Sequence, residues 1–527
     1  MAQQSLFGAS SDSTAQPAEG SHKLGAFLAK CLEVGNACKY FENPIIVHHY
    51  DADGISTGSV VALALKRLGK PFGIKVAKRI DEETIARIAE AGRPAIFCDL
   101  GSGALSKIMQ KFEPSKFAVI DHHELDATVG DIERQKVYEA NQLSFGFDGP
   151  TDASASTVAY LCFRGEPEET RKRLSELAIV GAIGDMQDAS GVGLHSLNRI
   201  VLDDAMALGS VNRTKDLRVF GRVSRTLVNF LSYCTEPFLP GLTGNEKACA
   251  QFLQKHGIPL FEGEELEGGT SAEGAGGARA AGAAAGAKTA HAEREVAGEK
   301  KKWLHYYDLP LEKRVDLASA IVEYAYASGL EEHAIRAMIG EVYLFPNEKQ
   351  NTEAYDAYEF STTLNACGRH DLPENGVKLC LGEDENALAE ARTVLELHRR
   401  MIRNGIFFAR KRVNDFGSFY FLDGRGEISD TVIGTVAGEF LGSGLVKRDK
   451  PILAFSLDEK GDVKVSGRGT KELLEKGLDL NQLMRQATAG FGLGGGHKIA
   501  AGASILQKGR ESEFLMRAKE ILKKQIG

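Results

Sequence analysis

Three short apolar runs near the N-terminus each end in aspartate or histidine, and this pattern constrains the fold more than any other feature. The runs are PIIVHHY, followed directly by Asp51, PAIFCDL, which contains Asp99, and KFAVIDHH, which ends at His123. Apolar runs of this length are typical of buried strands. Amphipathic segments at 55–69 and 81–92 lie between the runs. This alternation of strands and helices predicts βαβ units and a doubly wound, mostly parallel sheet in an α/β protein.

The chain is too long for one hydrophobic core, because cores stop growing at about 250 to 300 residues. We expect residues 1–23 to form a disordered tail and residues 24–261 to form the sheet domain with a helical extension. Residues 262–302 are rich in Gly, Ala, Glu and Lys and lack the large apolar side chains that offset the entropy of ordering. That segment is therefore predicted to be a flexible insert.

The C-terminal part of the chain predicts a second domain. A helical connector is expected over 303–334, and a smaller mixed α/β domain over 335–527. Within that domain, the segments 340–346 and 358–365 have the composition of strands. Residues 385–404 have the length and periodicity of a long helix.

The composition excludes several classes of protein. No run approaches the ~20 apolar residues of a membrane helix, so no membrane association is expected. The N-terminus has no basic region followed by an apolar run, so no secretory signal is predicted. The eight cysteines form no CxxC pair, which argues against a zinc ribbon or a disulfide framework and favours a reducing cytoplasm. The net charge of -8 means that any nucleic-acid groove must be a local basic surface.

Acidic and imidazole side chains follow the predicted strands at one edge of the sheet. Asp51 and Asp53 flank a single residue after the first run, Asp99 ends the second, and His122 and His123 end the third. A lone DxDG is as often a polar turn or a helix N-cap as it is a ligand site, and Asp99 alone could be an N-cap. However, ligands bind at the carboxyl ends of strands in open α/β sheets, and three strand ends deliver such residues together. Asp185, after a helical pattern, is a further candidate that alone could be a loop residue.

The motifs HHYDADG, CDLGSG, DHH and IGDMQD occur in this order, and the series resembles that of the DHH phosphoesterases. The resemblance implies two divalent metal ions, manganese preferred or magnesium, bound by Asp51, Asp53, Asp99, His122 and Asp185. It further implies that Asp99 bridges the metals, that Asp53, His122 and Asp185 complete one site, and that Asp51 lies on the other. His123 would support the phosphate or a ligand.

The chain departs from the family pattern before the first aspartate. Small-substrate relatives place a histidine four residues before that aspartate, where this chain has Val47. RecJ-like relatives tolerate an aspartate or histidine two residues before it, which makes His49 a candidate outer ligand.

The C-terminal half resembles the DHH-associated domain that closes over the substrate, which predicts a catalytic cleft between the two domains. The loop Gly494, Gly495, Gly496 and His497 resembles its glycine-rich signature, and Ser466 and Arg468 match a second part of its pattern. Glycines allow backbone N–H groups to approach a phosphate, and a guanidinium can grip one bidentately. Taken alone, such a loop is an ordinary turn, and Arg468 an ordinary surface arginine.

One motif selects the RecJ branch of the family. Leu364–Arg369 resembles the LNAxGR motif of RecJ proteins and makes Arg369 a candidate substrate contact. We find no additional oligonucleotide-binding barrel of the kind that bacterial RecJ carries, so the chain is closer to archaeal-type RecJ-like proteins.

Two basic stretches are compatible with a groove that tracks a nucleic-acid strand, although most charge runs are solvated helix faces. They contain Arg213, Lys215, Arg218, Arg222 and Arg225 in the first, and Arg399, Arg400, Arg403, Arg410, Lys411 and Arg412 in the second.

The resemblance therefore implies a two-metal exonuclease that hydrolyses single-stranded DNA or RNA in repair, replication or recombination. The alternatives are a small-substrate phosphodiesterase acting on nanoRNA, cyclic dinucleotides or phosphoadenosine phosphate, and a non-catalytic replication scaffold. By resemblance, GINS-type replication factors are candidate partners.

Overall fold

The computed structural model describes residues 17–188, 193–264, 294–296, 299–382 and 384–527. The chain forms two compact units. Unit 1 extends to Asp188 and includes Leu194–Leu208, and unit 2 begins at Gly209 and also includes Gly193. The helical extension after residue 208, expected to belong with the sheet domain, is therefore grouped with unit 2. No helix among the described residues is long and apolar enough to span a membrane.

Unit 1 is built on a five-stranded parallel sheet with the order β2-β1-β3-β4-β5. Its elements are α1 (Pro17–Tyr40), β1 (Ile45–His49), α2 (Ala52–Arg67), β2 (Gly73–Ala77), α3 (Glu82–Ala89), β3 (Ala95–Cys98), α4 (Leu105–Met109), β4 (Phe117–Ile120), α5 (Asp131–Arg134), β5 (Tyr138–Ala140), α6 (Gly149–Asp152), α7 (Ala155–Cys162), α8 (Glu168–Gly184) and α9 (Ser196–Ala207). The strand order reverses direction between β1 and β3, and ligands bind at such a switch point in open α/β sheets.

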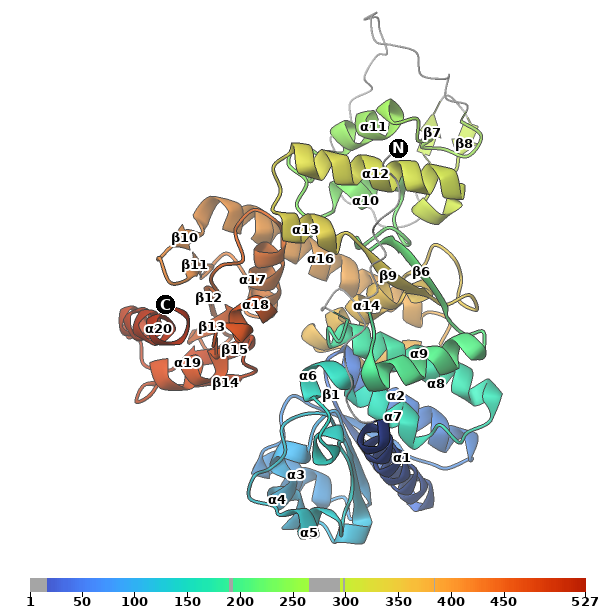
Figure 1. The fold of residues 1–527 in the computed structure, drawn as a ribbon, viewed down its shortest axis with the longest axis vertical. Coiled ribbons are helices and arrows are strands. Elements are labelled where there is room, and N and C mark those ends of the chain that lie inside the picture. The colour runs from blue at the N-terminus through green and yellow to red at the C-terminus, as the bar shows by residue number, and fades with distance from the viewer. Residues whose placement is uncertain (1–16, 189–192, 265–293, 297–298, 383) are drawn as a thin grey trace, which may run out of the picture. The chain divides into compact units, whose positions relative to one another are not determined.

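Helices cover both faces of this sheet, as buried parallel strands require (Figure 1). The apolar faces of α3 and α4 pack on one side through Ile85, Ile88, Leu105 and Ile108. On the other side α1 contacts β4 and β5, and α2 contacts β1 and β3. The predicted N-terminal parallel sheet is confirmed.

The first helix begins earlier in the chain than predicted, so the N-terminal tail is shorter than expected. We expected disorder through residue 23, but α1 already begins at Pro17. Proline is favoured in the first helical turn, because its missing N–H has no intrahelical partner there and its φ suits the helix. Residues 1–16 lie outside the described residues.

The contact between α1 and α7 requires a glycine. A β-carbon at Gly35 would lie 1.9 Å from the backbone oxygen of Cys162, whereas one at Gly25 in the same helix would meet nothing within 4 Å. We therefore expect Gly35→Ala to lower the free energy of unfolding by about 1 to 3 kcal/mol. Gly25→Ala is expected to raise it by about 0.5 to 1 kcal/mol, because alanine favours helix. Urea unfolding measures both, and equal effects would contradict this packing.

Unit 2 combines a helical part with a C-terminal sheet. Its elements are β6 (Asn212–Leu217), α10 (Leu227–Ser232), α11 (Glu246–Lys255), β7 (Arg294–Val296), β8 (Glu299–Lys301), α12 (Leu311–Ala327), α13 (Glu332–Ala337), β9 (Ile339–Leu344), α14 (Ala357–Arg369), α15 (Pro373–Leu381), α16 (Ala387–Arg412), β10 (Asn414–Asp415), β11 (Tyr420–Asp423), α17 (Ile433–Gly442), β12 (Ile452–Leu457), β13 (Val463–Arg468), α18 (Lys471–Glu475), α19 (Leu480–Ala487), β14 (Gly492–Gly496), β15 (Ala500–Ile505) and α20 (Glu511–Ile526).

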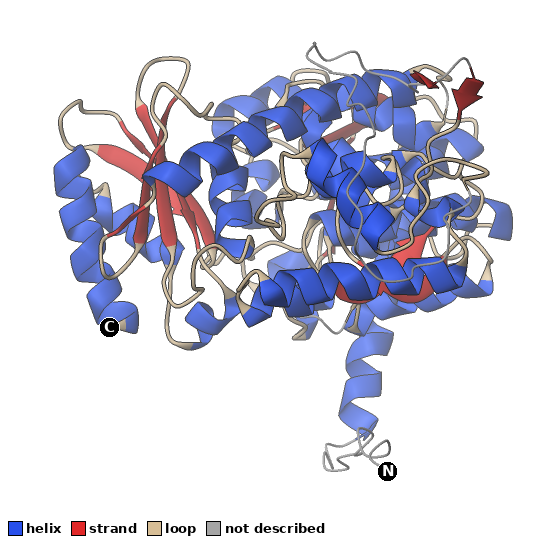
Figure 2. Ribbon diagram, turned by 90° about the horizontal axis from the view of Figure 1, so that it is seen from above, coloured by secondary structure: helices blue, strands red, loops and turns tan. Residues whose placement is uncertain are grey.

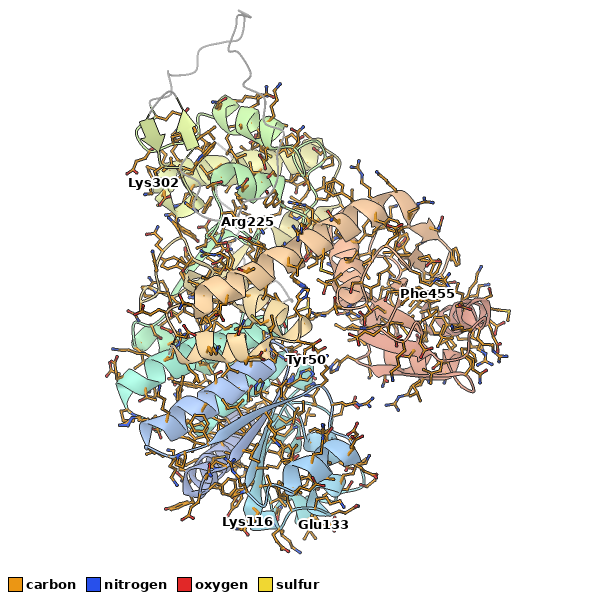
Figure 3. All side chains as sticks on the ribbon, turned by 180° about the vertical axis from the view of Figure 1, so that it is seen from behind. Tyr50, Lys116, Glu133, Arg225, Lys302 and Phe455 are labelled. Atoms are coloured by element: carbon orange, nitrogen blue, oxygen red, sulfur yellow. The ribbon has the colours of Figure 1, made fainter. Side chains whose placement is uncertain are left out.

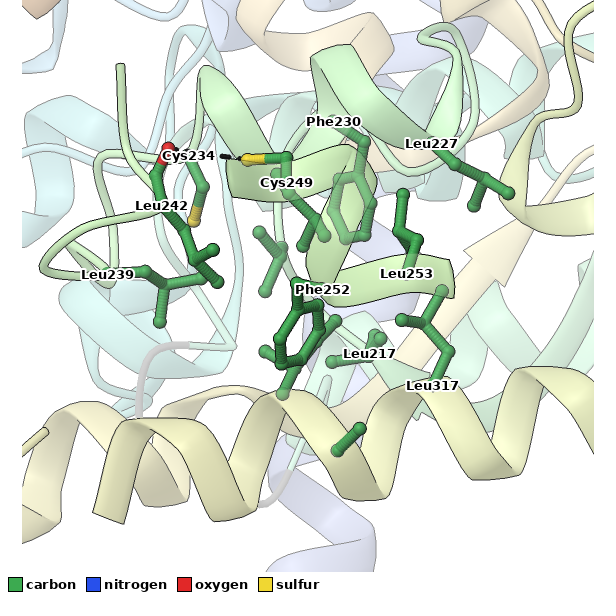
Figure 4. Close-up of a cluster of buried hydrophobic side chains, with 14 of the residues drawn as sticks. Leu217, Leu227, Phe230, Cys234, Leu239, Leu242, Cys249, Phe252, Leu253 and Leu317 are labelled. Atoms are coloured by element: carbon green, nitrogen blue, oxygen red, sulfur yellow. Dashed lines mark hydrogen bonds between the residues drawn. The ribbon is translucent and has the colours of Figure 1, made fainter. Parts of the chain in front are cut away.

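The helical part has its own core, drawn in Figure 4. Leu227, Phe230 and Leu253 from α10 and α11 pack against Leu317 and Ile321 of α12. Two segments on either side of the low-complexity insert thus share one core. Phe261 and Trp303, which flank the insert, form a β-bridge, and within its described part β7 pairs with β8. The prediction of flexibility for residues 265–293 falls outside the described residues.

One predicted strand is a helix. Residues 358–365 lie in α14, where Phe360, Leu364 and Cys367 form one buried face at helical spacing. The Asp356 side chain caps this helix by accepting from the backbone N–H groups of Tyr358 and Glu359. The β-branched and aromatic residues of this stretch favoured a strand, but the N-cap and the apolar face stabilise a helix.

The C-terminal sheet is mixed, with the order β10-β11-β12-β13-β15-β14. Only β11 and β12 pair in parallel, and the other neighbours are antiparallel. One face of the sheet packs against α19 and α20, and the other packs against α16 and α17. The C-terminal helix α20 lies beside the sheet in Figure 2. The predicted C-terminal mixed domain is confirmed for this sheet.

Candidate metal centre

The carboxyl ends of β1, β3 and β4 bring the acidic and imidazole residues of unit 1 together. His49 ends β1, Asp99 follows β3, and His122 and His123 follow β4. Figure 3 labels Tyr50, the residue directly after β1. Because adjacent parallel strands end at the same edge, side chains far apart in sequence converge here.

Three overlapping groups of side chains place their ligand atoms close enough to hold a metal ion. In each group the atoms lie within 4.8 Å of one another. The groups are Asp53, His122 and Asp185; His49, Asp51 and Asp99; and Asp99, His122 and His123. Asp99 and His122 each belong to two of the groups, so the three groups form one continuous cluster.

Asp99 and His122 lie at the centre of the cluster. The Asp99 Oδ1 atom lies 3.5 Å from His122 Nε2, and both atoms are buried without a hydrogen-bond partner among the described residues. Buried polar atoms are nearly always hydrogen-bonded, so atoms left without partners need an explanation such as an ion. Two such atoms 3.5 Å apart fit a divalent metal with oxygen and imidazole ligands.

The second predicted site is assembled around His49. Its Nδ1 atom lies 2.9 Å from Asp51 Oδ2 and 3.3 Å from Asp99 Oδ2. Although burial opposes the charged imidazole, Asp51 raises the pKa of His49 to about 9. The preceding His48 is different: it is fully buried, and burial lowers its pKa to about 4. Of the two histidines, only His49 belongs to the ligand groups.

Asp53 is held by the beginning of helix α7. Its two carboxylate oxygens accept the backbone N–H groups of Ala155 and Ser156 at 2.8 and 3.0 Å. Gly181 of α8 makes this approach possible, because a β-carbon there would lie 2.5 Å from Asp53 Oδ1. Ala155, Ser156 and Gly181 were not among the predicted site residues. Ser154, an N-cap residue before a helical run, was the available signal for the start of α7.

Asp185 is positioned by a chain of side-chain amides. Gln187 donates to Asp185 Oδ2 at 2.7 Å, and Asn198 of α9 donates to Gln187 Oε1 at 2.9 Å. Asn198 in turn accepts from the Thr157 hydroxyl at 2.6 Å. Burial raises the pKa of Asp185 to about 6. Neither Gln187 nor Asn198 was predicted as a site residue; the motif IGDMQD, which contains Gln187, was the available signal for the first, and nothing in residue type or spacing marks the second.

Asp121 orients its histidine neighbours and belongs to none of the ligand groups. It is fully buried and accepts the backbone N–H groups of Ser102 and His122 at 2.9 and 2.8 Å. Its Oδ1 atom also lies 2.8 Å from His123 Nδ1. Burial opposes charge on both groups, but the pairing holds the pKa of Asp121 well below its usual range and raises that of His123 to about 10. His123 is therefore held as an imidazolium whose Nε2 points away from Asp121.

Crowding of carboxylates predicts that neutralising Asp99 stabilises the metal-free protein. Burial, together with Asp51 and Asp53, raises the pKa of Asp99 well above its usual range. A carboxyl group whose pKa rises on folding makes the protein less stable as the pH increases above about 4, the pKa of the carboxyl in the unfolded chain. We expect Asp99→Asn to raise Tm in EDTA near neutral pH, by about 2 to 4 °C per kcal/mol of relieved repulsion.

The gain from Asp99→Asn should shrink as the pH falls, because the native carboxyl takes up its proton at its raised pKa, and it should vanish below about 4, where the unfolded carboxyl is protonated too. Thermal unfolding across this pH range measures the effect. Asp131→Asn, at an exposed position, is the matched control. A Tm for Asp99→Asn below that of the unaltered protein in EDTA would contradict the account of crowding.

The glycine-rich motif of the C-terminal sheet lies in unit 2. Ser466 of β13 and Gly495 of β14 both pair with Gly502 of β15, so they are neighbours across three strands. Arg468 pairs with Ala500, and the His497 backbone N–H donates to the oxygen of the same Ala500 at 2.8 Å.

The predicted substrate contacts of this sheet thus gather at one place. Gly496, with φ at 137°, adopts a conformation that L side chains rarely accept, and it leads into the turn that carries exposed His497. Gly434 of α17 packs closely here, since a β-carbon on it would lie 2.4 Å from Arg468 Nη2. Arg369 lies elsewhere in the unit, in the last turn of α14. The cleft expected between the domains remains a prediction.

Three family models match the chain in order. They are the N-terminal domain of the DHH family over residues 43–184, the DHH-CID domain over 219–268 and the DHHA1 domain over 419–524. An uncharacterized protein of Methanocaldococcus jannaschii is 28% identical over 512 residues, which cover 95% of this chain and 99% of that protein.

Solved structures with a similar fold cover nearly the whole chain. CDC45 from Entamoeba histolytica has a TM-score of 0.57 at 11% identity, covering 95% of this chain and 99% of that one. RecJ in complex with Mn2+ from Thermus thermophilus has a TM-score of 0.53 at 15% identity. The alignment covers 94% of this chain but 55% of the Thermus chain. A further exonuclease RecJ bound to manganese has a TM-score of 0.51 at 14% identity, covering 94% of each chain. At these identities the likeness shows the fold alone.

Proposed function

We propose that this chain, which belongs to the DHH superfamily and has a RecJ-like fold, is a metal-dependent exonuclease that hydrolyses phosphodiester bonds of single-stranded nucleic acid. The observation that carries this proposal is the cluster of Asp51, Asp53, Asp99, His122 and Asp185 at one edge of the unit 1 sheet. We further propose a role in DNA repair, replication or recombination in the cytoplasm. The eight free cysteines fit a reducing compartment.

The residues of the cluster divide between two proposed metal positions. Asp53, His122 and Asp185 would hold one ion, His49 and Asp51 the other, and Asp99 would be shared. Manganese is preferred over magnesium in this proposal, because carboxylates suit manganese and the set also contains imidazoles, whereas magnesium is bound through oxygen ligands. Bound ions of this kind supply a water of lowered pKa as nucleophile and stabilise charge on the attacking and leaving oxygens.

The protein's own groups fix the geometry of the reaction. The backbone N–H groups of Ala155 and Ser156 keep the Asp53 carboxylate in one orientation before any ligand binds. His123, charged through its pairing with Asp121, can donate from Nε2 to a nonbridging phosphate oxygen. In unit 2, Arg369, Ser466, Arg468, the backbone of Gly494–Gly496 and His497 are the proposed phosphate contacts.

One alternative enzyme differs from the exonuclease in the length of its substrate. A small-substrate phosphodiesterase would cleave nanoRNA or cyclic dinucleotides and lose activity as the strand lengthens. The test is manganese-dependent cleavage of dinucleotides beside 20-residue single strands and the matching duplex. Hydrolysis of the long single strand supports the exonuclease, and hydrolysis confined to dinucleotides contradicts it.

One alternative is not an enzyme: a replication scaffold that binds GINS-type factors, with which the fold shared with CDC45 is compatible. All five proposed ligand positions carry residues that can bind a metal, which supports the enzyme instead. Co-purification with such factors and an absence of hydrolysis on every polymer would support the scaffold.

A further inference from the structure

The two basic stretches of the sequence meet in unit 2, and the structure divides their arginines into two kinds. Arg222 is fully buried and ion-paired with Asp356, and Arg213 pairs with Glu341 at 2.6 Å. The charges of Arg222 and Arg213 are therefore neutralised by carboxylates of the protein itself. Arg225 and Arg403 have no carboxylate at ion-pair distance among the described residues. Arg225, labelled in Figure 3, lies in the helical part of the unit.

Aromatic rings hold Arg225 and Arg403 in place, together with Arg399, which is itself ion-paired. The Phe220 ring lies 4.2 Å from the Arg399 guanidinium carbon and 5.1 Å from that of Arg225. The Tyr233 ring lies 5.1 Å from Arg225 and 4.3 Å from Arg403. Three guanidinium groups and two rings therefore form one contiguous ladder. Contacts of this kind fix the planar forks of the arginines before a ligand arrives.

Four carboxylates face these three arginines, those of Glu236, Glu359, Glu396 and Glu439, and among the described residues Glu439 alone lies at ion-pair distance. Glu439 pairs with Arg399 at 2.9 Å and also accepts from the Thr235 hydroxyl. Glu359 faces Arg225, but its oxygens accept backbone N–H groups from the loop at 221–224.

The Arg225 guanidinium itself has an unmet donor. Its Nη1 atom is buried and has no hydrogen-bond partner among the described residues. Burial, together with neighbouring Arg399 and Arg403, lowers the pKa of Arg225 to about 10. Crowded like charges around a buried, unpartnered donor are the environment that a bound anion would stabilise.

We propose that Arg225, Arg399 and Arg403 form a phosphate-binding site, which takes a backbone phosphate of the nucleic-acid strand. The choice of a strand phosphate rests on the proposed function. Guanidinium groups bind phosphate oxygens bidentately. The Phe220 and Tyr233 rings already hold the three guanidinium groups close together. The site thus recognises phosphate whatever the base, and it lies in the helical part of unit 2 rather than in the glycine-rich sheet.

The test is binding of fluorescent oligothymidylates of increasing length, measured by anisotropy in EDTA so that no cleavage occurs. We expect Arg225→Gln and Arg403→Gln each to weaken binding of long strands about 10-fold. Each should also reduce the slope of log affinity against log salt by about 0.7, the value for one phosphate contact on a single strand. Arg336→Gln is the matched control, because Arg336 is 77% exposed and paired with Glu332 on α13.

The outcomes separate this site from the proposed function. If the unaltered protein binds strands and both variants keep its affinity and salt slope, the phosphate site is wrong. If it binds no strand, the proposed function fails, and inorganic pyrophosphate becomes the probe. A rise in Tm with pyrophosphate that both variants lose would still support a phosphate site, and no rise would overturn it. Half-buried Arg403 keeps the test valid should Arg225→Gln fail to fold.

Discussion

Replacing Asp53 or His122 with alanine is expected to lower manganese-dependent hydrolysis of single-stranded DNA by at least about 1,000-fold. The two side chains belong to the same ligand group, and His122 also contacts Asp99 at 3.5 Å. Stabilisation by a bound ion is worth several kcal/mol in the transition state, and about 4 kcal/mol corresponds to a factor of 1,000. Initial rates on a labelled strand measure the loss.

The control for these substitutions is Asp131→Asn, which removes one exposed carboxylate from α5, outside the cluster. It should leave the rate within a factor of two, by our estimate from the small effects of surface changes. Circular dichroism should show that both alanine variants remain folded. Intact hydrolysis in Asp53→Ala and His122→Ala would exclude the cluster as the catalytic site.

The second large effect is on stability and comes from the buried pair of Arg222 and Asp356. Both side chains are fully buried, and Asp356 also caps α14. Removing one partner of such a pair leaves an uncompensated charge and costs about 3 to 5 kcal/mol. We expect Arg222→Met, which preserves volume, to lower the free energy of unfolding by this amount in urea.

Adding Asp356→Asn to Arg222→Met should recover part of the loss, since no buried charge then lacks its partner. Arg336→Met at the exposed pair with Glu332 should change stability by no more than about 1 kcal/mol. Similar changes in the free energy of unfolding for Arg222→Met and Arg336→Met would show that the buried pair contributes little to the stability of the protein.

Much of unit 1 could be predicted because its strands are buried on both faces. Runs such as Ile45–His49 and Phe117–Ile120 are short, continuous and apolar, and the helices between them have clear periodicity. Once the strands are known to be parallel, the convergence of Asp51, Asp99 and His122 follows from topology. The geometry of the candidate site could thus be anticipated before any distance was known.

Other features depend on contacts that sequence patterns do not encode. The β-branched and aromatic composition of 358–365 favours a strand, but the cap by Asp356 and the buried face stabilise a helix. Arg222 and Arg225 lie three residues apart with similar surroundings in sequence. Only tertiary structure shows that one is ion-paired in the core and the other is not.

The support of the metal cluster was also beyond sequence reasoning. Gln187 and Asn198 act through a hydrogen-bond chain across two helices, and Gly181 acts by having no side chain. None of the three has a residue type that signals chemistry, and their roles depend on distances to Asp53 and Asp185.

The most direct test of the proposed exonuclease is a product-length time course with manganese. Single-stranded DNA and RNA carrying a label at the 5′ or the 3′ end would be incubated with the unaltered protein and with Asp53→Ala. We predict stepwise or processive shortening that requires the metal and is lost in Asp53→Ala, with the informative label giving the polarity. No shortening of any polymer, or shortening that persists in Asp53→Ala, would contradict the proposal that this cluster hydrolyses nucleic-acid strands.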